Sequence, residues 1–178
     1  MDILTILKKQ AEQVEVFGLE SEKTTVEYEA NQLKTCTVTS TKGTAARVIH
    51  KGRLGFSAST DRMAMDKLAA NVLESAAYGD QTSFSFSDPK PAIPVKTYDK
   101  AIVELSIDHL VEIGKEILDL ILSVDPVVRC NLSLARGLVS ANIRNQKGLD
   151  VSFQTSPLTL SIKLDRMEDN DVLIRYEQ

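Results

Sequence analysis

The chain has 178 residues, of which 43% are hydrophobic and 26% are charged, a composition typical of a soluble globular protein. A chain of this length buries about 70% of its unfolded surface, so it needs neither a disulfide nor a metal to support a core. The net charge of -4 disfavours a protein that mainly grips phosphate backbones, because such proteins carry a basic excess. Aromatic residues make up only 5%, so stacking surfaces for bases are few.

Neither the cysteines nor the N-terminus indicates export or a membrane. Cys36 and Cys130 match no metal or redox spacing, and we expect two reduced thiols. The start, MDILTILKKQ, places lysines after its apolar residues, which reverses the order of a signal peptide. No apolar run approaches the roughly 18–20 residues that span a bilayer. We therefore expect a cytoplasmic protein with no membrane partner.

The first expected elements are a short helix and a β meander. Apolar residues recur at helical spacing from Asp2 to about Gln13, which predicts an amphipathic helix. The next residues are rich in Val, Thr and Tyr and alternate with a period of two. We predict an antiparallel meander of four or five strands with turns at Glu20–Lys23, Ala30–Gln32, Lys42-Gly43 and Lys51-Gly52.

A second helix is predicted over the run DRMAMDKLAANVLESAAYG, whose apolar residues recur three and four apart. Thr60 or Asp61 offers an N-cap, and Gly79 stands where a helix commonly ends. We expect this helix to lie across the meander. Residues 80–100 then contain Pro89, Pro91 and Pro94, so they predict an extended connector rather than a packed element.

The last third predicts a sheet covered by a helix. Ser106 is the expected N-cap of a helix that ends before Pro126. Four alternating strands follow, each with one apolar and one polar face, and the helix at 106–123 is the expected cover of the apolar face. The polar face is predicted to carry Arg129, Asn131, Asn142, Arg144, Gln154 and Lys163.

These elements predict an α+β fold in which antiparallel β meanders are each packed by amphipathic helices. A helix-plus-meander unit occurs twice, with Lys42-Gly43 in one copy and Lys147-Gly148 in the other, so internal duplication is a hypothesis. The predicted divisions are a helix, meander and helix sublobe at 1–79, a Pro-rich connector at 80–100, and a helix-plus-sheet sublobe at 101–178.

No catalytic constellation stands out. His50 and His109 form no short-spaced metal pair, and the chain has no GxSxG elbow and no Cys-His signature. The acidic run MEDND, Met167 to Asp171, could bind a hard cation, although a solvated acidic turn is the commoner explanation.

The stretch RVIHKGRLGFSAS, Arg47 to Ser59, has the glycines and basic residues of a phosphate loop. It lacks GxGxxG and GxxxxGK[ST], and no βαβ unit surrounds it. A hairpin in which Gly52 takes a positive φ explains it better, and Gly55 indicates a bulge or a close backbone approach.

Three stretches resemble the N-terminal domain of the TldD/PmbA family, whose members are often labelled modulators of DNA gyrase. They are the block TSTKGTAARVIHKGRLGFSASTD, the alanine-rich helix ending AAYGD, and the connector into TYDKAIVELSIDHLVEIGKEIL. The chain departs from the family at Asn145-Gln146-Lys147-Gly148, where such proteins commonly show Asn-Ser-x-Gly. Family-marker or interface residues on this resemblance are Arg47, Gly52, Arg53, Gly55, Arg129, Asn142 and Arg144.

The resemblance implies a cytoplasmic zinc peptidase system in which TldD-like and PmbA-like subunits pair. In TldD-like members the zinc motif, of HExxxH type, lies beyond the N-terminal domain, and this chain contains no such motif. The resemblance therefore places no catalytic, cofactor-binding or metal residue in this chain, and zinc only in a parent assembly. It favours the PmbA-like side and implies that the chain is the N-terminal domain of a longer protein.

The expected function is that of a non-catalytic domain in a peptidase assembly, contributing to a dimer interface or a substrate chamber. The implied partners are a TldD/PmbA-type subunit or a second copy, and a peptide that could add to a strand edge by β-augmentation. The alternative is a regulatory protein-binding module of the gyrase-modulator type without peptidase activity. The acidic charge and scarce aromatics disfavour direct binding of nucleic acid.

Overall fold

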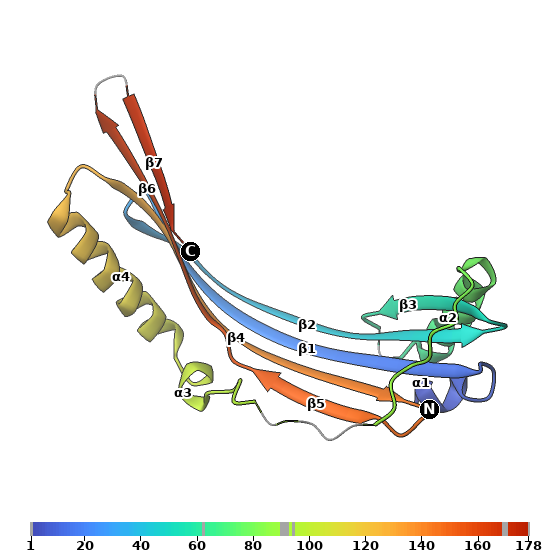
Figure 1. Ribbon diagram of the computed structural model, residues 1–178. Coiled ribbons are helices and arrows are strands. Elements are labelled where there is room, and N and C mark those ends of the chain that lie inside the picture. Colours follow the sequence, from blue (N-terminus) through green and yellow to red (C-terminus); the bar gives the residue numbers. More distant parts are fainter. Residues whose placement is uncertain (1, 62, 90–92, 94, 169–170, 178) are drawn as a thin grey trace. The chain divides into compact units, whose positions relative to one another are not determined.

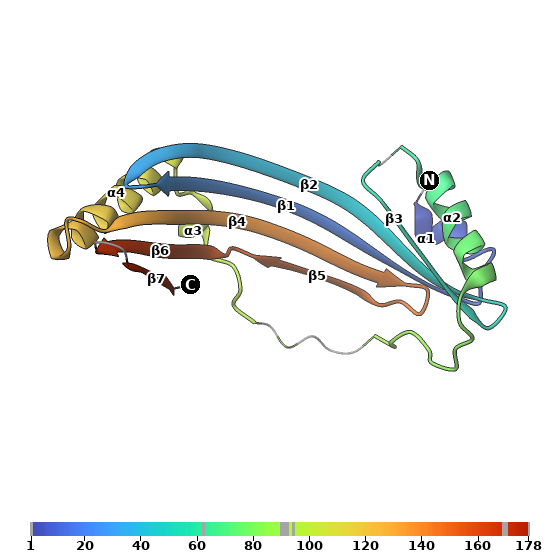
Figure 2. The same ribbon diagram turned by 90° about the horizontal axis from the view of Figure 1, so that it is seen from above.

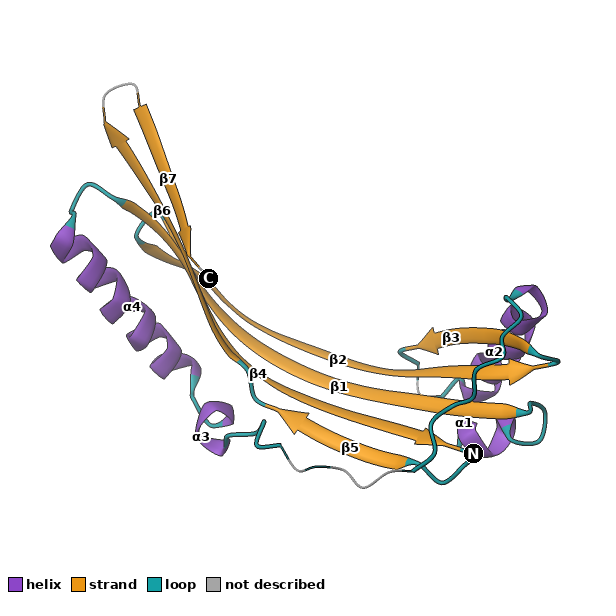
Figure 3. Cartoon of the chain, viewed as in Figure 1, coloured by secondary structure: helices purple, strands orange, loops and turns teal. Residues whose placement is uncertain are grey.

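A computed structural model of the chain describes residues 2–61, 63–89, 93, 95–168 and 171–177, with side chains as far as Arg166. Helices and strands are both present, which confirms the α+β class (Figure 3). No helix among the described residues has the length and apolar character needed to cross a bilayer. The elements in Figure 1 are α1 Ile3–Leu7, β1 Gln13–Glu29, β2 Gln32–His50, β3 Arg53–Ser59, α2 Met65–Tyr78, α3 Lys100–Val103, α4 Ile107–Val124, β4 Arg129–Asn145, β5 Asp150–Thr155, β6 Leu158–Glu168 and β7 Asp171–Glu177.

The strands form one sheet in the order β3-β2-β1-β4-β6-β7, with β5 also paired to β4. Strands β1, β2 and β4 run side by side in both views (Figures 1 and 2). The pairings of β2 with β3, β4 with β6 and β6 with β7 are antiparallel. The predicted antiparallel sheet is therefore confirmed.

Two compact units interleave along the chain. Unit 1 consists of Met1–Ser21, Thr41–Val95 and Val139–Gln154, and unit 2 of Glu22–Ser40, Lys96–Leu138 and Thr155–Gln178. Strands β1, β2 and β4 contribute residues to both units. The consecutive sublobes at 1–79 and 101–178, and the internal duplication, stay predictions.

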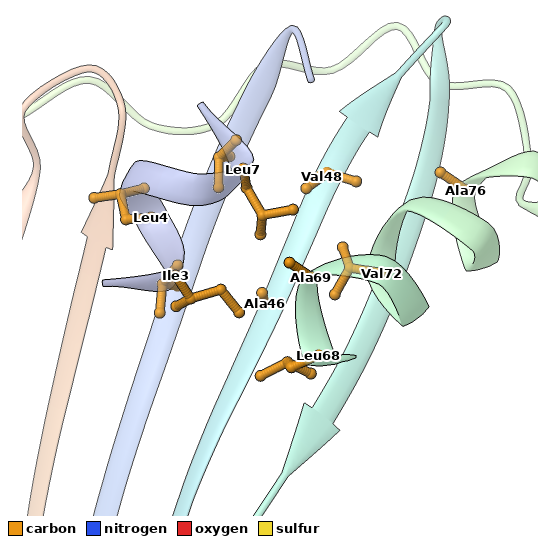
Figure 4. Packing of buried hydrophobic residues seen from close by; sticks show 11 residues of the cluster. Ile3, Leu4, Leu7, Ala46, Val48, Leu68, Ala69, Val72 and Ala76 are labelled. Atoms are coloured by element: carbon orange, nitrogen blue, oxygen red, sulfur yellow. The ribbon is translucent and has the colours of Figure 1, made fainter. Parts of the chain in front are cut away.

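The core of unit 1 lies between helices α1 and α2 and one face of the sheet (Figure 4). Alternate residues of β1 and β2 point toward these helices, because side chains on a strand alternate between its two faces. Each fully buried aliphatic side chain stabilises the fold by about 1.5–3 kcal/mol. The buried residues of this cluster are Ile3, Leu4, Leu7, Val14, Val16, Ala46, Val48, Leu68, Ala69, Val72 and Ala76.

The core of unit 2 lies beneath α4, which confirms the predicted helical cover of the C-terminal sheet. Ser106 is the N-cap, and its Oγ accepts a hydrogen bond from the His109 amide at 3.1 Å. Gly114 allows close contact with Tyr28, since an added Cβ would lie 2.6 Å from the Tyr28 ring. The Tyr28 hydroxyl donates to the Val111 carbonyl at 2.7 Å. The other buried members are Val26, Leu110, Leu118, Cys130, Leu132 and Leu134.

Several predicted boundaries were wrong. Helix α1 ends at Leu7 rather than near Gln13, and the first meander has three strands. No turn forms at Glu20–Lys23 or at Lys42-Gly43, because β1 and β2 each continue as a strand through these residues and Gly43 has no positive φ. The turns at Ala30-Asn31 and Lys51-Gly52 are confirmed by positive φ angles.

The predicted ends of α2 also differ from the structure. The helix begins at Met65, so neither Thr60 nor Asp61 is its N-cap. Gly79 has an extended backbone, with φ of -73°, rather than the left-handed form of many helix ends. Glycine is required here for steric reasons, because an added Cβ would lie 1.8 Å from the Leu54 carbonyl oxygen.

The first half of the predicted connector is packed, contrary to expectation. Phe86 is buried, and its amide donates to Gln13 Oε1 at 2.8 Å. The Asn145 side-chain amide donates to the Ser87 carbonyl at 2.7 Å. The side chains of Gln13 and Asn145 therefore hold this half of the connector by hydrogen bonds, although its prolines predicted a segment without packing. The predictions for Pro91 and Pro94 lie outside the described residues.

Replacing Gly55 by alanine should destabilise unit 1. The new Cβ would lie 2.4 Å from the Val72 carbonyl oxygen and 2.7 Å from Ala76 Cβ. We expect Gly55→Ala to lower the free energy of unfolding by about 1–3 kcal/mol, because α2 must move away from β3. Urea denaturation checks this, with Gly18→Ala as control, since nothing lies within 4 Å of that added Cβ. Equal effects at the two glycines would contradict the packing argument.

Candidate functional site

The glycine and arginine block from Arg47 to Ser59 forms the β2-β3 hairpin. The register pairs His50 with Arg53, and Lys51 and Gly52 form the turn with φ of 53° and 72°. Both Glu12 carboxylate oxygens accept from the Lys51 amide at 2.9 Å. The hairpin reading is therefore confirmed. An anion cradle needs free amides, and here a carboxylate of the chain already occupies the turn amide.

Arg53 and Gly55 join β3 to helix α2. Arg53 Nη1 donates to the Gly79 carbonyl at 2.7 Å, which places a cation at the negative end of the helix dipole. The Phe56 amide donates to Ser75 Oγ at 3.1 Å. The close approach predicted at Gly55 is confirmed by its contact with Val72 and Ala76. These two residues, predicted as family markers, therefore attach α2 to β3.

Arg47 holds the connector segment against unit 1. Its guanidinium pairs with Glu15 at 2.6 Å and lies 4.9 Å from the ring centroid of Phe86. Elsewhere in unit 1, Arg144 pairs with Asp2 at 2.9 Å. Asn142 donates to Asp150 Oδ1 on the neighbouring strand β5 at 2.9 Å. All these polar groups are engaged within the chain.

The residues predicted for the polar face are divided between the two units. Asn142, Arg144 and Gln154 belong to unit 1, whereas Arg129, Asn131 and Lys163 belong to unit 2. Exposed Arg129 lies opposite Asp165 in the β4-β6 register. A hollow of about 270 Å³ on unit 2 does bring two of the six together, since its lining includes Asn131 and Lys163 beside Glu27, Glu29, Lys34 and Ser133.

Several polar groups that line this hollow are engaged within the chain. Lys34 forms an ion pair with Glu29, which raises the pKa of the Lys34 ammonium. Asn131 accepts from the Ala30 amide at 3.0 Å and donates to Asp165 at 3.2 Å. Its lining contains no histidine or cysteine to act with the serines as a catalytic base or nucleophile. The hollow can contact a ligand, but it shows no machinery for covalent chemistry.

Sequence reasoning expected a strand edge but did not locate the open edge, defined here as residues 32–40, the part of β2 that belongs to unit 2. The neighbours of β2 in the sheet are β1 and β3, and the β3 register begins only at Thr44. Among the described residues, the open edge therefore has a strand on one side only. The expected turn at Lys42-Gly43 concealed it, although the run QLKTCTVTS is rich in β-branched residues with a single charge.

The described residues do not provide a zinc site. No group of three or more His, Cys, Asp or Glu side chains among them is arranged to hold a metal ion. His109 Nδ1 lies 3.1 Å from Ser106 Oγ, and burial raises the pKa of the Cys130 thiol. Zinc, which takes deprotonated thiolates and neutral imidazoles, does not fit these residues. The acidic run Met167–Asp171 lies outside the described side chains.

Part of the chain matches a family model, and its fold is similar to those of solved structures. Residues 14–76 match the family model described as PmbA/TldA metallopeptidase domain 1. No curated protein matches the chain. TldE from Thermococcus kodakarensis superposes with a TM-score of 0.85 at 16% identity, over 98% of this chain and 41% of that chain.

Two further solved structures match, both of proposed modulators of DNA gyrase. The protein from Thermotoga maritima has a TM-score of 0.82 at 18% identity, over 98% of this chain and 41% of that one. The protein from Bacteroides thetaiotaomicron has a TM-score of 0.85 at 18% identity, over 98% and 42%. The chain thus spans about two fifths of the length of these proteins. At such identities the likeness shows a shared fold.

The Glu12 contact predicts a pH-dependent contribution to stability. Hydrogen bonds from its own backbone amide and the Lys51 amide hold the pKa of the Glu12 carboxyl below its ordinary value. A depressed pKa stabilises the fold above the unfolded value of about 4.3, and this stabilisation is lost as the pH falls through the folded value. Glu12→Gln should therefore cost less than about 1 kcal/mol at neutral pH, since solvent screens the group.

Thermal denaturation between acidic and neutral pH checks this expectation. The difference between Glu12→Gln and the parent chain should disappear in acid. Glu74→Gln removes an exposed carboxylate from α2 and serves as the matched control. A difference for Glu12→Gln that persists unchanged in acid would show that the contact does not depend on ionisation.

Proposed function

Because the chain carries the first-domain pattern of the PmbA/TldD family over residues 14–76 and has the fold of TldE, we propose that it is a non-catalytic domain of a TldD/PmbA-like metallopeptidase assembly. In this proposal the assembly processes peptides in the cytoplasm, and the chain lies on the PmbA-like side. The description of the matched family model as a metallopeptidase domain supports the assignment. Any zinc is held by another part of the parent assembly.

The open edge is the observation that carries this role. It presents unpaired backbone donors and acceptors on β2, and such an edge is a template for another strand. An extended peptide or a strand of a partner subunit could pair with it backbone to backbone, largely independently of sequence. Lys34 belongs to both the edge and the lining of the hollow, so an added strand would have polar side chains beside it.

The family-marker residues have different roles in this proposal. Arg47, Gly52, Arg53 and Gly55 act indirectly, since their contacts shape unit 1. Asn142 and Arg144 act in the same way, through Asp150 and Asp2. Arg129 is exposed on unit 2, and we place it at the partner interface.

The proposal predicts that the purified chain neither retains stoichiometric zinc nor cleaves peptides. The described residues offer no group of metal ligands, and the Ser106 hydroxyl, which lies 3.1 Å from His109 Nδ1, serves as the N-cap acceptor of α4. Metal analysis after dialysis and a fluorogenic peptide library test the two parts. One tightly held zinc per chain, or proteolysis that copurifies with it, would overturn the non-catalytic role.

DNA binding distinguishes the proposed function from the gyrase-modulator alternative. We expect no tight binding to duplex DNA at moderate salt, because the chain carries a net charge of -4. Fluorescence anisotropy with a labelled duplex over a salt series provides the measurement. Tight binding with a steep salt dependence would reverse the ranking of the two functions.

A further inference from the structure

The hollow of unit 2 has the size of a subsite for one small polar group. Its lining comes from strands β2, β1, β4 and β6, which lie side by side in Figure 2. Its volume of about 270 Å³ is slightly below the range of roughly 300–1,000 Å³ that is usual for sites of drug-sized ligands. The hollow therefore suits an amino-acid side chain or a chain terminus rather than a whole peptide.

The charged groups of the hollow leave one carboxylate without a partner. Lys34 forms an ion pair with Glu29, and Lys163 pairs with Asp165 at 3.1 Å. The Glu27 carboxylate, which also lines the hollow, has no ion pair and no hydrogen bond with any residue that the structure describes. The hollow therefore keeps one negative charge that the chain does not compensate.

Two serine hydroxyls form a row with this carboxylate across the sheet. Ser133 lies directly opposite Ser161 in the β4-β6 register. Backbone hydrogen bonds join β1 and β4 near both ends, from Asn31 to Cys130 and from Gln146 to Val14. This antiparallel pairing places Glu27 opposite Ser133, so the three side chains lie on one face with neighbouring Cβ atoms about 4.5–5.5 Å apart. Within the described part of the chain, neither hydroxyl has a hydrogen-bond partner.

This row matches a primary ammonium group. Such a group carries three N–H donors, one positive charge and no acceptor. Glu27, Ser133 and Ser161 offer one carboxylate and two hydroxyl oxygens as acceptors, and a hydrogen bond to an ionised carboxylate is among the stronger ones. The charges of the hollow also favour an ammonium. The pKa of the Lys34 ammonium is raised by its hydrogen bond to Glu29, by the charge of Glu29 and, to a smaller extent, by the charge of Glu27.

Other classes of ligand fit the row less well. An oxyanion would meet the Glu27 carboxylate, while both lysines of the hollow are already paired. Calcium takes about 6–8 oxygen ligands, more than one carboxylate and two hydroxyls supply. A guanidinium is a planar fork that suits a bidentate carboxylate, and it would leave the hydroxyls unused.

We propose that the hollow of unit 2 binds a primary ammonium group through Glu27, Ser133 and Ser161. Both the N-terminus of a peptide and the side chain of a lysine carry such a group. The inference goes beyond the proposed function and does not depend on it, because the site consists of side chains of β1, β4 and β6 rather than the backbone of the open edge.

An NMR titration of the isotope-labelled chain at constant ionic strength tests the binding. Methylammonium should shift the backbone amide signals of Glu27, Ser133 and Ser161 in a saturable manner. Tetramethylammonium has the same charge but no N–H donor, so it should bind about tenfold more weakly. The absence of a saturable shift with methylammonium, or equal binding of the two cations, would overturn the inference.

Substitutions identify the acceptors in the same titration. Glu27→Gln should weaken methylammonium binding by about tenfold or more, because a charge-assisted hydrogen bond is lost. Ser133→Ala and Ser161→Ala should each weaken it by about threefold. Glu22→Gln removes an exposed carboxylate from the same strand outside the hollow and is the matched control. Unchanged binding in Glu27→Gln, or an equal loss in Glu22→Gln, would contradict the site, and circular dichroism verifies that each variant is folded.

Lys34 is the ammonium of the chain itself that competes for this row. The β1-β2 hairpin, with β1 ending at Glu29 and β2 beginning at Gln32, places Lys34 opposite Glu27. Lys34→Met should bind methylammonium at least as tightly as the parent chain, because a cation leaves the hollow. Binding that is seen only in Lys34→Met would overturn the inference, since the row would then serve the chain's own lysine.

Small peptides distinguish the two sources of the ammonium. Tighter binding of alanylalanine than of its N-acetylated form would assign the N-terminal ammonium. Tighter binding of Nα-acetyl-lysine amide than of its Nε-acetylated form would assign the lysine side chain. If neither binds although methylammonium does, the hollow does not receive the ammonium of a peptide and the inference fails. The proposed function stands in each case, because it rests on the open edge.

Discussion

Each compact unit depends on burying one face of its part of the sheet beneath helices. In unit 1, α1 and α2 cover residues such as Val14 and Val48, and in unit 2, α4 covers Val26 and Cys130. An antiparallel sheet covered in this way keeps a second face for polar residues. The hollow of unit 2 and the engaged side chains around it are consequences of that division.

The most distinctive stretch of the sequence serves this packing. Gly55 lets α2 contact β3 without a gap, and Arg53 binds the carboxyl end of that helix. The amides that a phosphate loop would leave free are used within the chain, by Glu12 at Lys51 and by Ser75 at Phe56. A block that looks like a ligand loop therefore holds a helix on a strand.

The polar side chains described above differ from the open edge in that they are engaged within the chain. Arg47, Asn142 and Arg144 contact other parts of unit 1, and Asn131 is bonded at both ends of its side-chain amide. The open edge differs, because its backbone groups have a strand on one side only. Recognition through a strand edge requires no particular side chain, since the contacts are made by the main chain.

Sequence periodicity alone determined the kinds of element and their amphipathic faces. The period of two around Val26 and Tyr28, and the capped helix after Ser106, predicted a sheet with a helical cover. The turns at Ala30-Asn31 and Lys51-Gly52 were also predictable, because positive φ angles have a local cost that glycine and asparagine reduce.

Tertiary structure alone decided where strands continue and where an edge stays open. Lys42-Gly43 reads as a turn, yet β2 continues through it because pairing with β1 outweighs the local preference. Phe86 is held in place by residues distant in sequence. Its amide donates to Gln13, and the Arg47 guanidinium lies over its ring. Local propensity contains no information about which strand lies alongside another, so the open edge at 32–40 emerged only from the pairing of the folded sheet.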